Sequence, residues 1–120
     1  MSVVTPQPQA LLLRLEGYEG PLDLLLELAR AQKVDLARLD ILALVDQYLA
    51  VIEGARRVRL ELAADWLVMA AWLAWLKSRL LLPDPEPDED AEAATVSLTD
   101  RLQGLEMLRA GAAWLDGQPM

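Results

Sequence analysis

One segment, residues 60–82, constrains the fold more than any other, because it is apolar on nearly every side when drawn as a helix. Six of its apolar side chains repeat with the four-three spacing of a coiled coil, and we call them the seam. The seam consists of Leu62, Trp66, Met69, Leu73, Leu76 and Leu80. A helix that is apolar nearly all round is normally buried on several sides. The sequence therefore predicts a helical bundle around this segment, which ends at Pro83 because proline cannot continue a helix.

A second side of the same helix combines large apolar residues with charged ones, and we call it the mixed sector. It consists of Glu61, Asp65, Val68, Trp72, Trp75 and Arg79. Aromatic side chains ringed by charges are typical anchors of protein–protein interfaces. Two interpretations stay open: Trp72 and Trp75 face a partner, or their rings cover the chain at residues 11–15.

The composition favours helices and argues against catalysis. Hydrophobic residues, mostly Leu and Ala, make up 54% of the chain, and aromatic residues only 5%. The sequence has neither Cys nor His, which excludes thiol nucleophiles, histidine-based triads, disulfides and nearly all zinc sites. An enzyme built on carboxylates would need paired acids in a pocket, but the acids here lie mostly on predicted wet helix faces or in a predicted linker. We therefore expect a module with no catalysis and no cofactor.

The net charge of −8 is concentrated in one stretch, because six acidic residues lie between Asp84 and Glu92. The remainder is close to neutral and has no basic patch able to neutralise many phosphates, so direct DNA binding is not expected. The most basic string, residues 56–59, is predicted to be a solvated loop. No secretory signal is visible. The longest uncharged stretch, residues 66–76, would rise about 16 Å, roughly half a bilayer core, so we expect no membrane-spanning helix and a cytoplasmic location.

The N-terminal part, residues 10–83, is predicted to hold three helices and a short arm. Residues 10–15 form either a strand-like arm or a cap on the helices. The first helix is expected to begin at Pro21, whose fixed φ suits the first helical position. The second helix has Asp40 as its N-cap and Gly54 as its end.

Three further segments flank this bundle. Residues 1–9 are predicted to be a disordered lead, and residues 84–96 an acidic, proline-rich linker. A last helix, within residues 97–120, would begin at Ser97, where Ser97–Asp100 resembles a capping box. Its apolar stripe consists of Leu98, Leu102, Leu105, Leu108, Ala112 and Leu115. The predicted fold class is all-α: a three-helix N-terminal bundle with a short arm, an acidic linker and a further helix.

Three strings, in this order and spacing, resemble the segregation and condensation protein A family, the bacterial kleisins. They are YEGPLDLLL (18–26), DI (40–41) followed by QYL (47–49), and WLVMAA (66–71) followed by KSRLLLP (77–83). Where the family usually has Phe, this chain has Tyr18 and Trp66, so an aromatic ring is kept. Family members are longer and finish in a winged-helix domain, which we expect to be absent from this chain.

The resemblance implies a function that composition cannot show. In this family the N-terminal helices pack against the neck coiled coil of an SMC ATPase, and the middle region binds a dimer of segregation and condensation protein B. The C-terminal winged helix closes a ring around DNA that supports chromosome condensation and segregation. We therefore expect a cytoplasmic, nucleoid-associated, non-catalytic subunit that meets DNA only through its complex, lacks ring closure and has no membrane contact.

The resemblance and the helical faces together yield candidate partner-binding residues. For the SMC neck, the mixed-sector candidates are Val68, Trp72, Trp75 and Arg79. The seam candidates are Trp66, Met69, Leu73 and Leu76, although we favour the internal core for the seam. For the segregation and condensation protein B dimer, the candidates are Leu102, Leu105, Leu108 and Leu115. The alternative is a free-standing helical adaptor unrelated to SMC proteins, and unpaired apolar faces could also produce non-native homo-oligomers.

Overall fold

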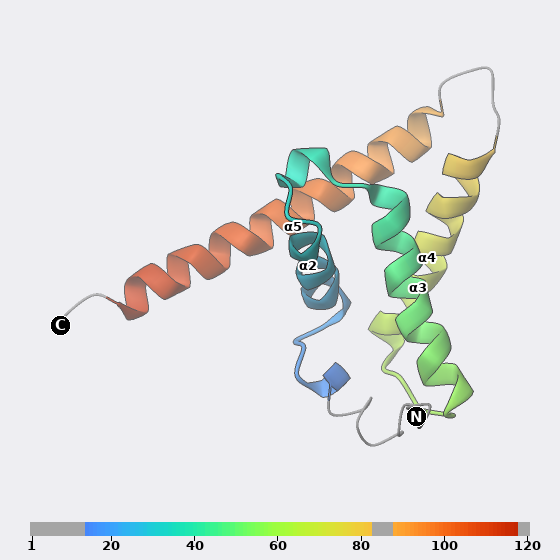
Figure 1. Cartoon of the computed structure of the whole chain (residues 1–120), viewed down its shortest axis with the longest axis horizontal. Coiled ribbons are helices and arrows are strands. Elements are labelled where there is room, and N and C mark those ends of the chain that lie inside the picture. The colour runs from blue at the N-terminus through green and yellow to red at the C-terminus, as the bar shows by residue number, and fades with distance from the viewer. Residues whose placement is uncertain (1–13, 83–87, 118–120) are drawn as a thin grey trace, which may run out of the picture.

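The computed structural model describes residues 14–82 and 88–117, and these residues form helices and connecting turns without a strand. The elements are α2 (Pro21–Ala31), the 3-10 helix η1 (Leu36–Arg38), α3 (Ile41–Arg57), α4 (Ala64–Leu81) and α5 (Glu89–Asp116). Helices α3 and α4 lie side by side, α2 packs next to them, and α5 crosses this group and continues beyond it (Figure 1). The all-α prediction is confirmed.

The starts of α2 and α3 follow the sequence predictions. Pro21 occupies the first turn of α2, where its missing N–H costs no helical hydrogen bond. The Asp40 side chain caps α3 by accepting from the Ala43 backbone N at 3.0 Å. Gln32, just after α2, donates to the Asp40 carbonyl at 3.0 Å and accepts from the Asp40 N at 2.9 Å. This two-way bond ties the end of α2 to the start of α3.

The predicted end of α3 at Gly54 is wrong, because the helix continues to Arg57. It ends in a Schellman turn, in which the Leu60 N donates to the Ala55 carbonyl at 2.9 Å and Arg59 adopts a φ of 56°. Ala55 is fully buried, so core packing continues past the glycine. The predicted loop at residues 56–59 is therefore half helix, and α4 begins at Ala64 instead of Leu60.

The predicted start of the last helix at Ser97 is also wrong. Helix α5 begins at Glu89, and its N-cap is Asp88, whose side chain accepts from the Ala91 N at 3.0 Å. The acidic residues of its first turn interact favourably with the positive end of the helix dipole. Residues 89–96 are thus helical and not a linker, while residues 83–87 lie outside the described part of the chain.

The core draws on every α-helix of the described chain. Its largest fully buried side chains are Tyr48, Leu25, Leu26, Leu44, Val45, Leu73, Leu76, Leu98 and Leu102. The Tyr48 hydroxyl donates to the Trp66 carbonyl at 2.9 Å, and the two rings stack with centroids 6.3 Å apart. Leu15 is buried in the same core and residues 14–16 are helical, so this end of the predicted arm is a cap and not a strand. Residues 10–13 of the arm lie outside the described residues, as does the predicted lead.

Candidate functional site

A groove of about 870 Å³ lies between α4 and α5, on the side of α4 that carries the mixed sector. Its α4 wall consists of Ala64, Asp65, Val68, Met69, Trp72 and Trp75, and its α5 wall of Asp90, Ala93, Ala94, Ser97 and Arg101. The α4 wall supplies large apolar side chains, whereas the α5 wall is built mainly of small ones. A helix seated here could therefore approach α5 closely while its apolar side chains contact the tryptophans.

Two large apolar side chains of the α4 wall remain open to solvent. Val68 is 68% exposed and Trp75 is 36% exposed, whereas Trp72 is half-buried and packs partly against the core. The Arg79 guanidinium carbon lies 5.6 Å from the centroid of the Trp75 ring, a cation–π arrangement. Arg79 also pairs with Asp88 at 3.5 Å, so the same arginine braces Trp75 and the start of α5.

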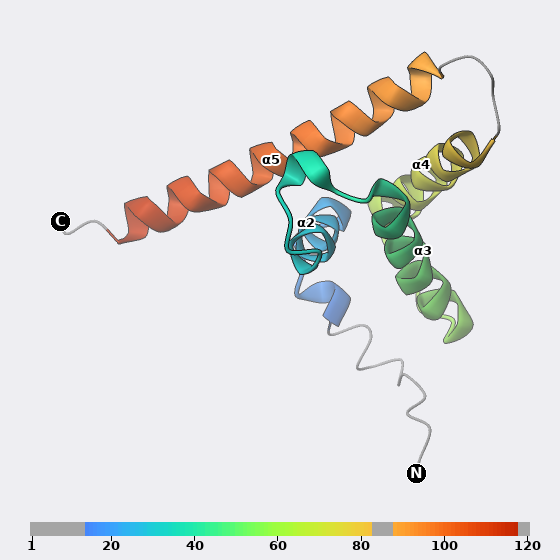
Figure 2. The ribbon, with the colours of Figure 1, turned by 45° about the horizontal axis from the view of Figure 1, so that its top comes forward.

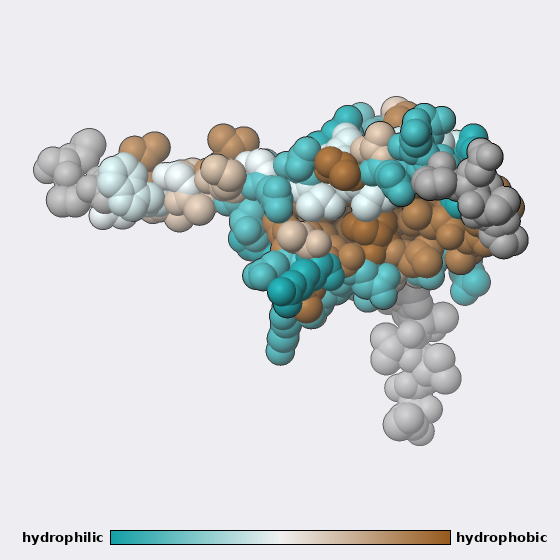
Figure 3. Space-filling model, turned by 90° about the horizontal axis from the view of Figure 1, so that it is seen from above, coloured by the Kyte–Doolittle hydropathy of each residue, from teal (hydrophilic) through white to brown (hydrophobic). Residues whose placement is uncertain are grey.

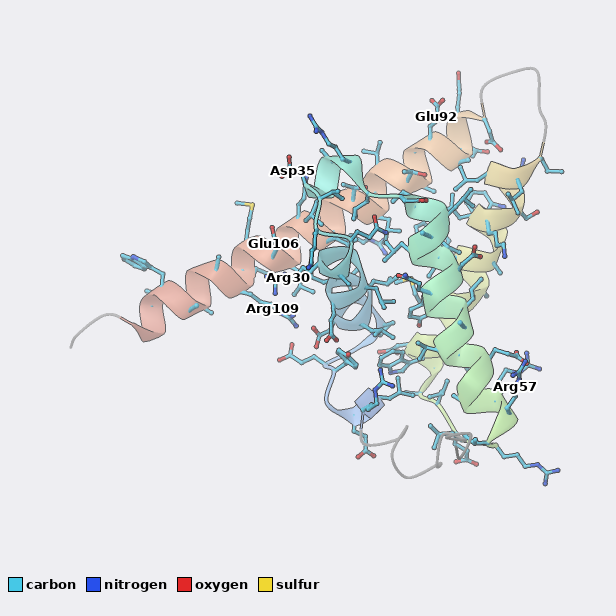
Figure 4. The ribbon with its side chains drawn as sticks, in the orientation of Figure 1. Arg30, Asp35, Arg57, Glu92, Glu106 and Arg109 are labelled. Carbon is cyan, nitrogen blue, oxygen red and sulfur yellow. The ribbon has the colours of Figure 1, made fainter. Side chains whose placement is uncertain are left out.

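The charge around the groove is mainly negative. Asp65 and Asp90 line the groove itself. A shallower hollow of about 650 Å³ adjoins it along α5 and adds Glu89, Glu92 and Asp100, with Arg101 shared by both. Figure 4 shows Glu92 near the N-terminal end of α5, pointing away from the other helices. An apolar groove with an acidic border suits a helix whose apolar face is flanked by Lys or Arg.

The structure separates the predicted site residues into buried and exposed groups. Trp66, Leu73 and Leu76 of the seam are buried in the core, and Met69 is partly buried and also lines the groove. This burial agrees with the interpretation of the seam as internal core. Leu80, the last seam residue, is 37% exposed, because the last turn of α4 lies beyond the start of α3 in Figure 1.

The predicted stripe of the last helix is divided in the same way. Leu98 and Leu102 are fully buried against the bundle, and Leu105 is partly buried. Leu108 and Leu115 are exposed, on the half of α5 that extends away from the other helices in both ribbon views (Figure 2). The first half of this helix thus packs against the bundle, whereas its second half does not.

Sequence reasoning missed two exposed apolar residues on the projecting half of α5, Met107 and Trp114. Their separation by seven residues places them on one side of a helix, next to Leu108 and Leu115, which was the available signal. Ion pairs mark the place where α5 leaves the bundle: Arg30 pairs with Glu106 at 3.5 Å, and Arg109 pairs with Asp23. Figure 4 shows Arg30, Glu106 and Arg109 together at this crossing.

A further apolar surface lies at the end of the bundle. Leu81 and Leu82 are exposed there, next to the exposed Leu80. Seen from above, hydrophobic residues gather beside α5, on the side where α3 begins and α4 ends (Figure 3). The described chain therefore has three solvent-exposed apolar regions: the groove, this end of the bundle and the projecting half of α5.

Two tyrosines have altered acidity. Burial raises the pKa of Tyr48 above its ordinary value, and the hydrogen bond to Glu27 is the main cause that raises the pKa of Tyr18. Neither tyrosine faces the groove. Among residues 14–82 and 88–117, no three acidic side chains gather closely enough to hold a metal ion. Within the same residues, every helix is too short or too polar to cross a bilayer.

Comparison with known proteins gives concordant matches. Residues 28–105 match the family model described as segregation and condensation protein ScpA. A segregation and condensation protein A from Coxiella burnetii is 44% identical over 113 residues, which are 93% of this chain and 42% of that protein. The protein of the same name from Lactiplantibacillus plantarum is 48% identical over 83 residues, 69% of this chain and 32% of that protein. One from Xylella fastidiosa is 44% identical over 115 residues, 93% of this chain and 38% of that protein. The chain thus spans less than half the length of these curated relatives.

Proposed function

The chain belongs to the segregation and condensation protein A family, and from this premise we propose that it is a kleisin segment whose helices bind the neck coiled coil of an SMC ATPase. The observation that carries the proposal is the solvent-exposed groove of about 870 Å³ between α4 and α5. Its occupant would be one helix of the neck. In this role the chain would act in chromosome condensation and segregation.

The groove supports this proposal through shape and charge. Covering exposed apolar side chains such as Val68 and Trp75 with a partner lowers the free energy of the complex. Large aromatic anchors contribute much of the binding free energy in such interfaces. The acidic border, including Asp65 and Asp90, favours basic residues beside the apolar face of the neck helix. Seam residues such as Leu73 are already buried in the core, so we propose that they hold α4 in place and do not contact the partner.

Size-exclusion chromatography with an SMC head-plus-neck fragment tests the proposal. The wild-type chain is expected to co-elute at concentrations on the order of tens of micromolar. Val68→Asp and Trp75→Ala are expected to abolish co-elution with unchanged helical circular dichroism, because both side chains are exposed. Leu81→Ala, an exposed residue of α4 that does not line the groove, is the matched control and should still co-elute. A well-folded wild-type chain that elutes separately would exclude neck binding.

For the second partner, we propose that the projecting half of α5 binds the segregation and condensation protein B dimer. The exposed residues Leu108 and Leu115 keep their predicted role, and Met107 and Trp114 join them. Leu102 is buried against the bundle, so it would support this surface indirectly. Substituting Leu108 and Leu115 by Asp should abolish co-purification with the dimer and leave neck binding intact. If the variant still co-purifies with the dimer, the dimer binds a surface other than the projecting half of α5.

The proposal also covers catalysis, location and DNA. The chain would act as a non-catalytic subunit at the nucleoid, without a cofactor, and would meet DNA only through its complex. Family membership argues against the alternative of an unrelated helical adaptor. The apolar regions at the groove and on α5 would be covered by partners in the complex. Self-association of the isolated chain would therefore cover the same surfaces in place of the missing partners.

A further inference from the structure

Helix α5 is a single helix with two different environments. Helix α5 contacts α2, α4 and η1, and its first half buries Ala91, Ala94, Leu98 and Leu102. From Met107 onward its apolar side chains are exposed, and the helix extends away from the bundle (Figures 1 and 2). Because the helix is continuous, the way its first half docks determines where its second half points.

The docking contact is narrow. It rests on the fully buried Leu98 and Leu102, the partly buried Leu105 and two small alanines, with ion pairs at its ends. Burial of apolar area is the largest contribution to such a contact, so we expect Leu98 and Leu102 to supply most of the docking free energy and the pair of Arg109 with the largely buried Asp23 to add to it.

The same half of α5 forms one wall of the groove. Ala93, Ser97 and Arg101 face the space that Val68 and Trp75 border from α4. A helix bound in the groove would therefore touch both walls and hold α5 in its docked position. If α5 undocks, the occupant loses the contacts of one wall.

We propose that α5 couples two binding regions: occupation of the groove stabilises the docked α5, and the docked α5 fixes the direction of the projecting surface at residues 107–117. The inference rests on the proposed function only for the identity of the groove's occupant. Binding equilibria are reciprocal, so undocking α5 weakens groove binding by the same factor by which groove binding strengthens docking.

Distance measurements between two spin labels test the docking step without any partner. The chain has no cysteine, so Glu53→Cys on α3 and Ala113→Cys on α5, both exposed, provide the only two labelling sites. In this background we expect a narrow distance distribution. Leu98→Ala with Leu102→Ala should broaden it, whereas Leu108→Ala with Leu115→Ala, the same substitutions on the exposed half, should not. A distribution that stays narrow in the first variant would overturn the proposal.

A milder variant keeps the test valid if the double alanine variant unfolds. Arg109→Glu reverses the charge next to Asp23 at the edge of the docking contact and leaves the core leucines intact. It should also broaden the distribution, while the variant remains helical by circular dichroism. An unchanged distribution in this folded variant would count against the proposal.

Binding of an SMC head-plus-neck fragment tests the coupling. The Leu98→Ala, Leu102→Ala variant should bind about tenfold more weakly than the wild type, although its substitutions leave the α4 wall unchanged. Adding the fragment should narrow the broadened distance distribution of Arg109→Glu. Equal affinity of the wild type and the docking variant would exclude coupling. No binding by the wild type would instead refute the proposed function, while the distance measurements would still decide whether α5 docks.

Discussion

Asp23 near the start of α2 forms an ion pair with Arg109 at the point where α5 leaves the bundle. The Asp23 side chain is only 12% exposed, and its carboxylate also accepts a hydrogen bond from the Glu19 backbone N at 3.0 Å. One carboxylate thus joins the turn before α2, the first turn of α2 and a distant part of α5. This contact orients α5 where its apolar burial ends.

A double-mutant cycle measures this contact. We expect Asp23→Asn and Arg109→Gln to show a coupling free energy of about 0.5–1 kcal/mol in urea unfolding, decreasing with added salt. The exposed pair of Arg56 and Glu53, 3.8 Å apart, is the control and should show a coupling close to zero. If the changes in unfolding free energy at positions 23 and 109 are strictly additive, the ion pair does not contribute to the stability of the protein in solution.

The Tyr48 hydroxyl provides a second prediction. Tyr48→Phe removes the hydrogen bond to the Trp66 carbonyl but keeps the stacked ring. We expect a loss of about 1 kcal/mol in the free energy of unfolding, because the buried carbonyl keeps only its helical partner. Thermal and urea unfolding would measure it. A variant as stable as the wild type would show that the hydrogen bond makes no net contribution.

Stability should fall at alkaline pH because of the buried tyrosine. Burial raises the pKa of Tyr48 above its ordinary value of 10.0, so the unfolded chain releases this proton at a lower pH than the folded one. The stabilisation is therefore complete below about pH 10 and decreases above it, by about 1.4 kcal/mol per pH unit. Urea unfolding between about pH 9 and pH 11 would show this slope. The unfolding free energy of Tyr48→Phe should decrease less steeply with pH. Equal slopes in the variant and the wild type would show that Tyr48 does not cause the pH dependence.

Two leucines on α4 separate core from surface. Leu76 is fully buried and Leu81 is 59% exposed. Leu76→Ala should lower the free energy of unfolding by about 2–5 kcal/mol through lost contacts and a cavity. The same substitution at Leu81 should change it by less than about 0.5 kcal/mol. Equal losses would mean that the end of α4 is covered in solution, for example by self-association.

The N-cap of α5 distinguishes the observed helix start from the one predicted at Ser97. Asp88→Ala should cost about 1 kcal/mol and speed hydrogen exchange at residues 89–92, because it removes the side-chain acceptor for the Ala91 N. Asp88→Asn keeps an acceptor and tests the ion pair with Arg79 separately. Ser97→Ala should have little effect, since Ser97 lies inside the helix. If Ser97→Ala lowers the stability more than Asp88→Ala, the helix begins at Ser97, as predicted from the sequence.

The groove was predictable only in part. Periodicity in the sequence identified one α4 side that mixes Val68, Trp72 and Trp75 with charges, and these residues form much of the α4 wall. The α5 wall was not predicted, because Ala93 and Ser97 lie in a stretch expected to be a linker and a helix start. Small residues next to an acidic, proline-rich string carry no local sign of burial. Their role depends on what packs against them.

The sequence alone determined the helical class, the starts of α2 and α3, and the side of α4 that carries the buried Trp66 and Leu73. Each of these follows from contacts within a few residues: Pro21 at a first turn, Asp40 capping the Ala43 N, and the spacing of Trp66 and Leu73 along one helix side. Local geometry is enough to decide such features.

The tertiary structure decided where α5 begins and how far it is buried. Asp88 and Ser97 are both suitable N-caps, so local chemistry could not choose between them. Burial of Ala91 and Ala94 against the bundle selects the earlier start. Leu102 and Leu108 belong to one apolar stripe, yet only Leu102 is buried, because the surface of the bundle ends between them. That boundary is a property of the packed helices and is not present in the pattern of a single one.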